Sequence, residues 1–107
     1  MMARTWGRLY LGTRNHRKIK TLRRRHPGSW KTFYVLLEMA LETDDEGWIY
    51  LEPGLPYPLE KLADEVDETP EYLQSLLNAM AELGLIQIDG QCIRLLPPNN
   101  NNPKVDL

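Results

Sequence analysis

The chain has 107 residues, of which 42% are hydrophobic and 26% are charged, so it is long enough for one domain with a modest core but not for two. Its longest apolar runs, such as 34–37, are far shorter than the roughly 20 residues that cross a bilayer, which argues against a membrane-spanning protein. The N-terminus lacks the apolar core of a secretory signal. Together with the single cysteine, Cys92, this predicts a cytoplasmic protein without disulfides.

The formal net charge of -2 conceals a division along the chain. Residues 1–31 hold ten of the thirteen basic residues and no acid, whereas all fifteen acids lie from Glu38 onward. Nucleic-acid binding follows local basic patches and not the overall balance. The N-terminal segment is therefore the candidate for contact with a polyanion.

The first half of the chain predicts two helices and a strand. After an extended or short helical opening around Trp6, a helix is expected over 15–25, stopped by the Pro-Gly pair at 27–28. A second helix is expected over 29–43, with Ser29 as its N-cap and an acidic turn at its end. The aromatic and β-branched segment 48–51 predicts a short strand.

Two further helices are well marked. Pro58 fits the first position of a helix over 58–66, and residues 67–68 make a tight turn. Thr69 caps a fourth helix over 70–83, with Pro70 at its first position and Gly84 as its stop. A short connection between two helices of this kind predicts a helix-turn-helix unit.

The segment after the fourth helix predicts a β-hairpin. Strands are expected over 85–88 and 91–95, joined by a two-residue turn at Asp89-Gly90. In that register Ile86 lies opposite Ile93, Ile88 lies opposite Gln91, and the three isoleucines share one face against the helices. Residues 97–107 have no periodicity and are expected to form a disordered tail or linker.

The order of these elements predicts the fold class. Helix, tight turn, helix and hairpin, with an earlier strand to complete a small sheet, is the order of a winged helix-turn-helix domain. We expect a mainly α domain with a small β-sheet over residues 1–96, because each element leaves an apolar face that only the others can cover.

Several motifs also resemble a known family, the N-terminal domain of phage replisome organiser proteins, which is related to the winged-helix domain of the bacterial primosome protein DnaD. The resemblance covers residues 3–96. It lies in Arg-Thr-Trp at 4–6, the basic segment 17–23, Gly-Trp-Ile-Tyr-Leu at 47–51, the segment 57–63 and the segment 82–88. It implies a winged-helix fold and a part in the initiation of DNA replication.

The first predicted helix carries most of the candidate DNA-binding residues. At about 100° per residue, Arg17, Lys20 and Arg24 fall within about 60° of one another and opposite Ile19 and Leu22. Like charges at these spacings cost a few tenths of a kcal/mol each, so phosphate binding explains them better than stability does. The alternative is salt bridges with the acidic half, or a merely solvated face. The predicted set in this segment is Arg14, Arg17, Lys18, Lys20, Arg23, Arg24 and Arg25.

The fourth predicted helix takes the place of a recognition helix. Gln74, Ser75 and Asn78 lie on its outer face and are able to hydrogen-bond base edges in a major groove. Arg94 of the hairpin completes the predicted DNA-binding set.

The charge of the same helix favours another use. It contains no Lys or Arg, and Glu71 and Glu82 would repel phosphates. Protein contact therefore competes with DNA reading here, and the predicted contact residues are Glu71, Tyr72 and Glu82.

No phosphate loop, nucleophile elbow or metal-ligand spacing occurs in the chain, so we expect neither an enzyme nor a cofactor, metal, membrane or small-molecule partner. Two functions remain: binding of double-stranded DNA, and association with itself or with another replication protein. The two are compatible. A basic first helix and acidic third and fourth helices are able to pair head to tail between copies, because opposite potentials steer association.

Overall fold

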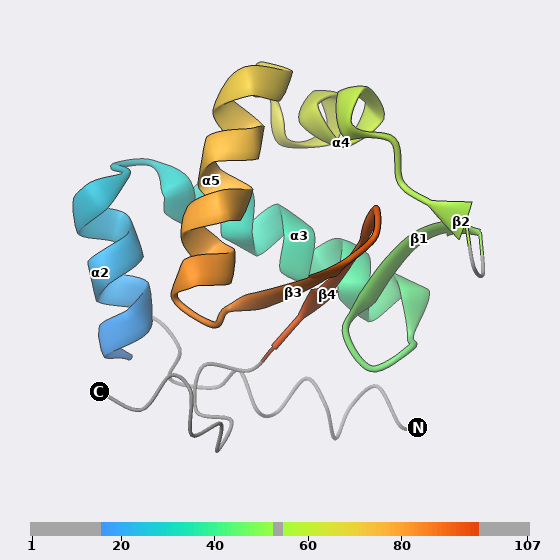
Figure 1. Cartoon of the computed structure of the whole chain (residues 1–107), viewed down its shortest axis with the longest axis horizontal. Helices are drawn as coiled ribbons and strands as arrows, with labels where there is room; N and C mark the ends of the chain where they lie inside the picture. The colour runs from blue at the N-terminus through green and yellow to red at the C-terminus, as the bar shows by residue number, and fades with distance from the viewer. Residues whose placement is uncertain (1–15, 53–54, 97–107) are drawn as a thin grey trace.

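The computed structural model describes residues 16–52 and 55–96 (Figure 1). Within these ranges no helix is long and apolar enough to cross a membrane. The elements, in chain order, are α2 (Arg17–Arg25), α3 (Ser29–Thr43), β1 (Trp48–Glu52), β2 (Leu55–Pro56), α4 (Leu59–Val66), α5 (Pro70–Glu82), β3 (Ile86–Asp89) and β4 (Cys92–Leu95). The predicted opening around Trp6, the predicted tail and Arg14 lie outside the described residues.

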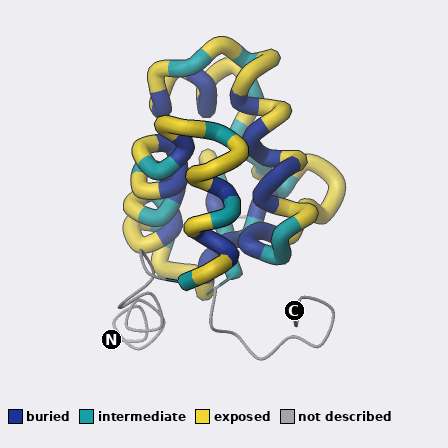
Figure 2. The backbone as a smooth tube through the Cα atoms, turned by 90° about the vertical axis from the view of Figure 1, so that its left-hand side faces the viewer, coloured by how far each residue is buried: buried dark blue, intermediate teal, exposed yellow. Residues whose placement is uncertain are grey.

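The helices and a small sheet share one core, which confirms the winged helix-turn-helix fold. The sheet has the order β2-β1-β4-β3 with antiparallel neighbours. Helix α3 packs on β1 and β4, α5 packs on β3, and α2 packs on α3 (Figure 1). Figure 2 shows the buried turns of the helices facing inward. The largest fully buried side chains include Phe33, Leu36, Ile49, Leu76 and Met80.

Helix α3 has the predicted bounds, but Ser29 is not its N-cap. Gly28 takes that position in a left-handed conformation with φ 91°, so the helix begins at Ser29 itself. The Ser29 hydroxyl is fully buried and donates to the Leu22 carbonyl of α2 at 3.5 Å. The prediction of the cap was wrong because the hydroxyl is used to join two helices.

The helix-turn-helix unit follows its sequence signals closely. Asp67 ends α4 in a left-handed conformation with φ 59°. The Thr69 hydroxyl then accepts a hydrogen bond from the Tyr72 amide at 3.2 Å, with Pro70 as the first residue of α5. Three other helix ends differ from the predicted bounds by one or two residues. Pro58 is the N-cap of α4, Leu83 is the C-cap of α5, and α2 begins at Arg17.

The hairpin has a different register from the one predicted. Its turn is Gly90-Gln91, so Ile88 pairs with Ile93 and Ile86 with Leu95. Gly90 has φ 64° at the first turn position, as in a type II′ turn. The shift of two residues keeps the faces unchanged and fully buries Leu95, which stabilises the fold by about 1.5–3 kcal/mol and outweighs the local preference for Asp-Gly.

Two features of the sheet escaped the sequence patterns. Ile88 is 42% exposed and does not join the helices as predicted, because it lies next to the tip of the hairpin. Strand β2 extends the sheet beyond β1, with Pro56 opposite Tyr50. A two-residue strand that contains proline gives almost no periodic signal, and proline is tolerated there because β2 is an edge.

Candidate nucleic-acid interface

Helix α2 presents a basic surface at one end of the molecule. Its buried residues Ile19 and Leu22 face α3, so the opposite face of the helix carries the exposed side chains of Arg17, Lys20 and Arg24. We call these three residues the α2 ridge. Helix α2 forms an outer edge of the structure in Figure 1, and Figure 2 looks onto that edge.

The α2 ridge is not neutralised within the described part of the chain. Across 16–52 and 55–96, the basic residues in ion pairs are Arg25, Lys31 and Arg94, and none of them belongs to the ridge. The predicted alternative of salt bridges with the acidic half therefore applies to Arg25, which contacts Glu82 of α5 at 3.5 Å, whereas the ridge residues have no such partner within 16–52 and 55–96.

Helix stability accounts for part of the basic character of α2. Arg23, Arg24 and Arg25 occupy the last turn, where positive charge is favoured by the helix dipole. Arg17 lies in the first turn, where the same dipole opposes it and the helix has no acidic residue. Arg23 also lies over the ring of Trp30, with its guanidinium carbon 6.0 Å from the centroid. Neither the helix dipole nor a contact of this kind with an aromatic ring explains the positive charges of Arg17 and Lys20.

Lys18 differs from the other predicted cations of α2. It is only 4% exposed, and burial, followed by the charge of Arg17, lowers the pKa of its ammonium group. Its amide donates to the Nδ1 atom of His16 at 3.2 Å, which caps the helix. The structure thus separates Lys18 from the ridge, although the sequence places it in the same run.

Side chains on the outer face of α5 form local hydrogen bonds within the helix. The Gln74 amide donates to the Asn78 side-chain oxygen at 3.1 Å, and the Ser75 hydroxyl donates to the Tyr72 carbonyl at 2.8 Å. These bonds occupy one donor of Gln74 and the hydroxyl proton of Ser75, which limits the groups left for a base edge. Glu71 is exposed beside them, so the face combines uncharged polar groups with negative charge.

Two of the predicted protein-contact residues of α5, Tyr72 and Glu82, contact residues at the C-terminal end of α2. Glu82 is 75% exposed in its ion pair with Arg25. The Tyr72 ring is 36% exposed and meets His26 edge-on, with 6.4 Å between the centroids. The two helices therefore meet along a mixed charged and aromatic seam.

Arg94 of the hairpin is held against its own sheet. Its Nε atom donates to the Glu46 carbonyl at 3.0 Å, and its guanidinium lies 3.7 Å from the Glu46 carboxylate. The same group lies over the Trp48 ring, 5.6 Å from the centroid. Arg94 is thus fixed as a strap on the turn before β1, and its charge is largely compensated.

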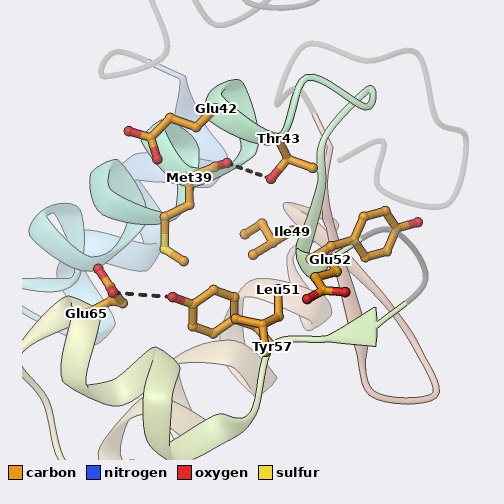
Figure 3. A pocket seen from close by; sticks show the side chains of 9 residues that line it. Met39, Glu42, Thr43, Ile49, Leu51, Glu52, Tyr57 and Glu65 are labelled. Atoms are coloured by element: carbon orange, nitrogen blue, oxygen red, sulfur yellow. Dashed lines mark hydrogen bonds between the residues drawn. The ribbon is translucent and has the colours of Figure 1, made fainter.

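A groove with acidic walls lies far from α2, between α3, β1 and α4. It has a volume of about 400 Å³ and is lined by Met39, Glu42, Thr43, Ile49, Tyr50, Leu51, Glu52, Tyr57 and Glu65 (Figure 3). The Tyr57 hydroxyl donates to the Glu65 carboxylate at 3.3 Å. Burial, then Glu65 and Glu42, raises the pKa of Tyr57. No motif predicted this site, because its residues come from separate segments.

The comparison with protein families gives one clear result. Residues 6–101 match the family described as N-terminal phage replisome organiser, which is nearly the whole chain. No curated protein and no solved structure matches the chain.

Proposed function

The chain belongs to the N-terminal phage replisome organiser family, and from this membership we propose that it is a non-catalytic, cytoplasmic module that binds double-stranded DNA through the α2 ridge. The observation that carries the proposal is the exposure of Arg17, Lys20 and Arg24 without an acidic partner among the described residues. An organiser of replication has to engage DNA or the proteins that act on it.

The dimensions of the ridge suit a phosphate backbone. Arg17 and Arg24 are seven residues apart, which is about 10 Å along a helix. That length equals about three steps of roughly 3.4 Å along the axis of a duplex, when the helix lies along that axis. Three contacts to phosphates give affinity with little dependence on base sequence.

Helix α5 supplies at most a secondary contact in this proposal. Gln74, Ser75 and Asn78 are placed on an exposed face, but Gln74 is hydrogen-bonded to Asn78 and Ser75 to the Tyr72 carbonyl, which occupies part of their hydrogen-bonding capacity. Contact with a protein through Glu71, Tyr72 and Glu82 stays a prediction for the same helix.

A salt titration tests the proposal. Binding to a mixed-sequence duplex of about 20 base pairs, followed by fluorescence anisotropy from low to moderate salt, should weaken linearly in a log–log plot with a slope of about -0.9 for each neutralised phosphate. The triple variant Arg17→Gln, Lys20→Gln, Arg24→Gln should flatten the slope by about 2.7 if each ridge residue neutralises one phosphate.

The matched control removes the same charge from other elements. Lys31→Gln, Lys61→Gln and Lys104→Gln together also delete three cations, none of which is in α2 or in the predicted DNA-binding set. This variant should keep the slope of the original chain within about one unit. An unchanged slope in the ridge variant, or an equal flattening in the control, would contradict the proposal.

A further inference from the structure

The groove of Figure 3 is acidic on several sides and apolar at its base. Glu42 comes from α3, Glu52 from β1 and Glu65 from α4, and none of the nine lining residues is Lys or Arg. Met39 and Leu51, which is 41% exposed, supply apolar surface beside these carboxylates. The groove combines the two surfaces that a long basic side chain needs.

Arginine and lysine place an aliphatic stem on apolar surface and a charged head in a polar surrounding. In this groove the stem would lie along Met39 and Leu51, and the head would form charge-assisted hydrogen bonds with the carboxylates. Glu65 is already oriented by the hydroxyl of Tyr57. The occupant that fits is therefore a basic side chain projecting from a rigid element.

The chain itself provides such an element. The α2 ridge carries three cations on one helix face, and residues 1–31 contain no acid that would oppose entry into the groove. Helix α2 and the β1–β2 end of the sheet, which borders the groove, lie on opposite sides of the structure in Figure 1. The ridge is thus placed away from its own groove, and the ridge of a second copy is a helical basic surface that supplies the complementary charge.

We propose that the α2 ridge of one copy docks into the acidic groove of a second copy, head to tail. The two surfaces are different, so the contact is heterologous and each added copy leaves one ridge and one groove free. Association therefore extends into open chains or closes into rings, and it weakens with salt because both surfaces are exposed. The proposal does not depend on DNA binding.

Sedimentation equilibrium of the full chain without DNA tests the contact. At about 20 mM salt the weight-average mass should rise with concentration above the monomer mass of 12.5 kDa, and at about 500 mM salt it should return toward that value. A groove variant, Glu42→Lys with Glu52→Lys, and a ridge variant, Lys20→Glu with Arg24→Glu, should each remain monomeric at low salt.

An equimolar mixture of the two variants tests whether the contact joins the ridge of one copy to the groove of another. The basic ridge of the groove variant faces the intact acidic groove of the ridge variant, so the mixture should recover a mass of at least twice the monomer. The control Glu60→Lys with Asp89→Lys makes the same change of charge at exposed residues outside the groove and should associate like the original chain.

Three results would overturn the proposal: a monomeric original chain at low salt over the whole concentration range, association of either single-surface variant alone, or a monomeric mixture. Circular dichroism of each variant establishes that it is folded. Because DNA is absent, these results are independent of the titration that tests the proposed function.

Discussion

Helices α2 and α5 bury apolar faces in the same core, yet their outer faces have opposite character. α2 exposes arginine and lysine, whereas α5, which follows the tight turn of the helix-turn-helix unit, exposes glutamate, glutamine and asparagine. The fold places α5 where a recognition helix is expected, but the side chains place positive charge on α2. The position of a helix in a fold and the chemistry of its surface are separate properties, and polyanion binding follows the second.

The seam between the two helices does not cancel this difference. The Arg25–Glu82 ion pair is solvent-exposed, and pairs of this kind contribute about 0–1 kcal/mol. It compensates one cation of α2 and leaves the ridge unchanged. The seam therefore joins two surfaces that are able to act independently.

The largest expected effect comes from changes in the hydrophobic core that α2 and α5 share. Leu22 of α2 and Leu76 of α5 are fully buried in one hydrophobic cluster. Leu22→Ala or Leu76→Ala should each lower the free energy of unfolding by about 2–5 kcal/mol, measured by urea denaturation. Tyr34→Ala, at a side chain that is 54% exposed, is the control and should cost far less. A loss below about 1 kcal/mol at Leu22 would mean that α2 is not part of the cooperative core.

The next effect concerns the outer face of α5. Neutralising its acids with Glu71→Gln and Glu82→Gln should strengthen binding to a duplex by about twofold to thirtyfold at low salt, since exposed charge interactions of this kind are worth roughly 0.2–1 kcal/mol each. Glu82→Gln also releases Arg25. The measurement is fluorescence anisotropy, with Glu38→Gln and Glu60→Gln as controls on α3 and α4. Equal gains in the control would show that net charge, and not the face of α5, limits DNA binding.

The smallest expected effect comes from the N-caps of the two helices, which differ in their response to pH. α5 is capped by Thr69, which does not titrate near neutral pH, whereas α2 is capped by the Nδ1 atom of His16. Burial, then Lys18 and Arg17, holds the pKa of His16 below its usual value of about 6.5, so folding favours the neutral ring. The stabilisation is complete above pH 6.5 and is lost as the pH falls through the folded-state pKa, because the unfolded chain then binds more protons.

His16→Asn keeps a capping oxygen without this titration. As the pH falls from about 7 to about 5, the original chain should therefore lose more unfolding free energy than His16→Asn does. The extra loss should be less than the roughly 1 kcal/mol that a helix cap contributes. Thr69→Ala, in contrast, should lose about 1 kcal/mol equally at both pH values. Identical pH profiles for the original chain and His16→Asn would refute the role of His16.

The local elements could be predicted from the sequence because their signals are local. The bounds of α3, the cap and first residue of α5 and the existence of the hairpin follow from spacing, capping residues and turn residues within a few positions of one another. The α2 ridge was predicted for the same reason, since the helical period alone sets Arg17, Lys20 and Arg24 opposite Ile19 and Leu22.

Partners distant in the chain were decided only by the tertiary structure. The hairpin register depends on the burial of Leu95, and Ser29 is used as a link to α2 because the two helices pack together. The ion pair of Arg25 and the strap formed by Arg94 each join residues about fifty positions apart. The acidic groove gathers glutamates from three elements. A periodic pattern fixes the direction of a side chain from its own helix or strand, but packing of the whole chain determines what it meets there.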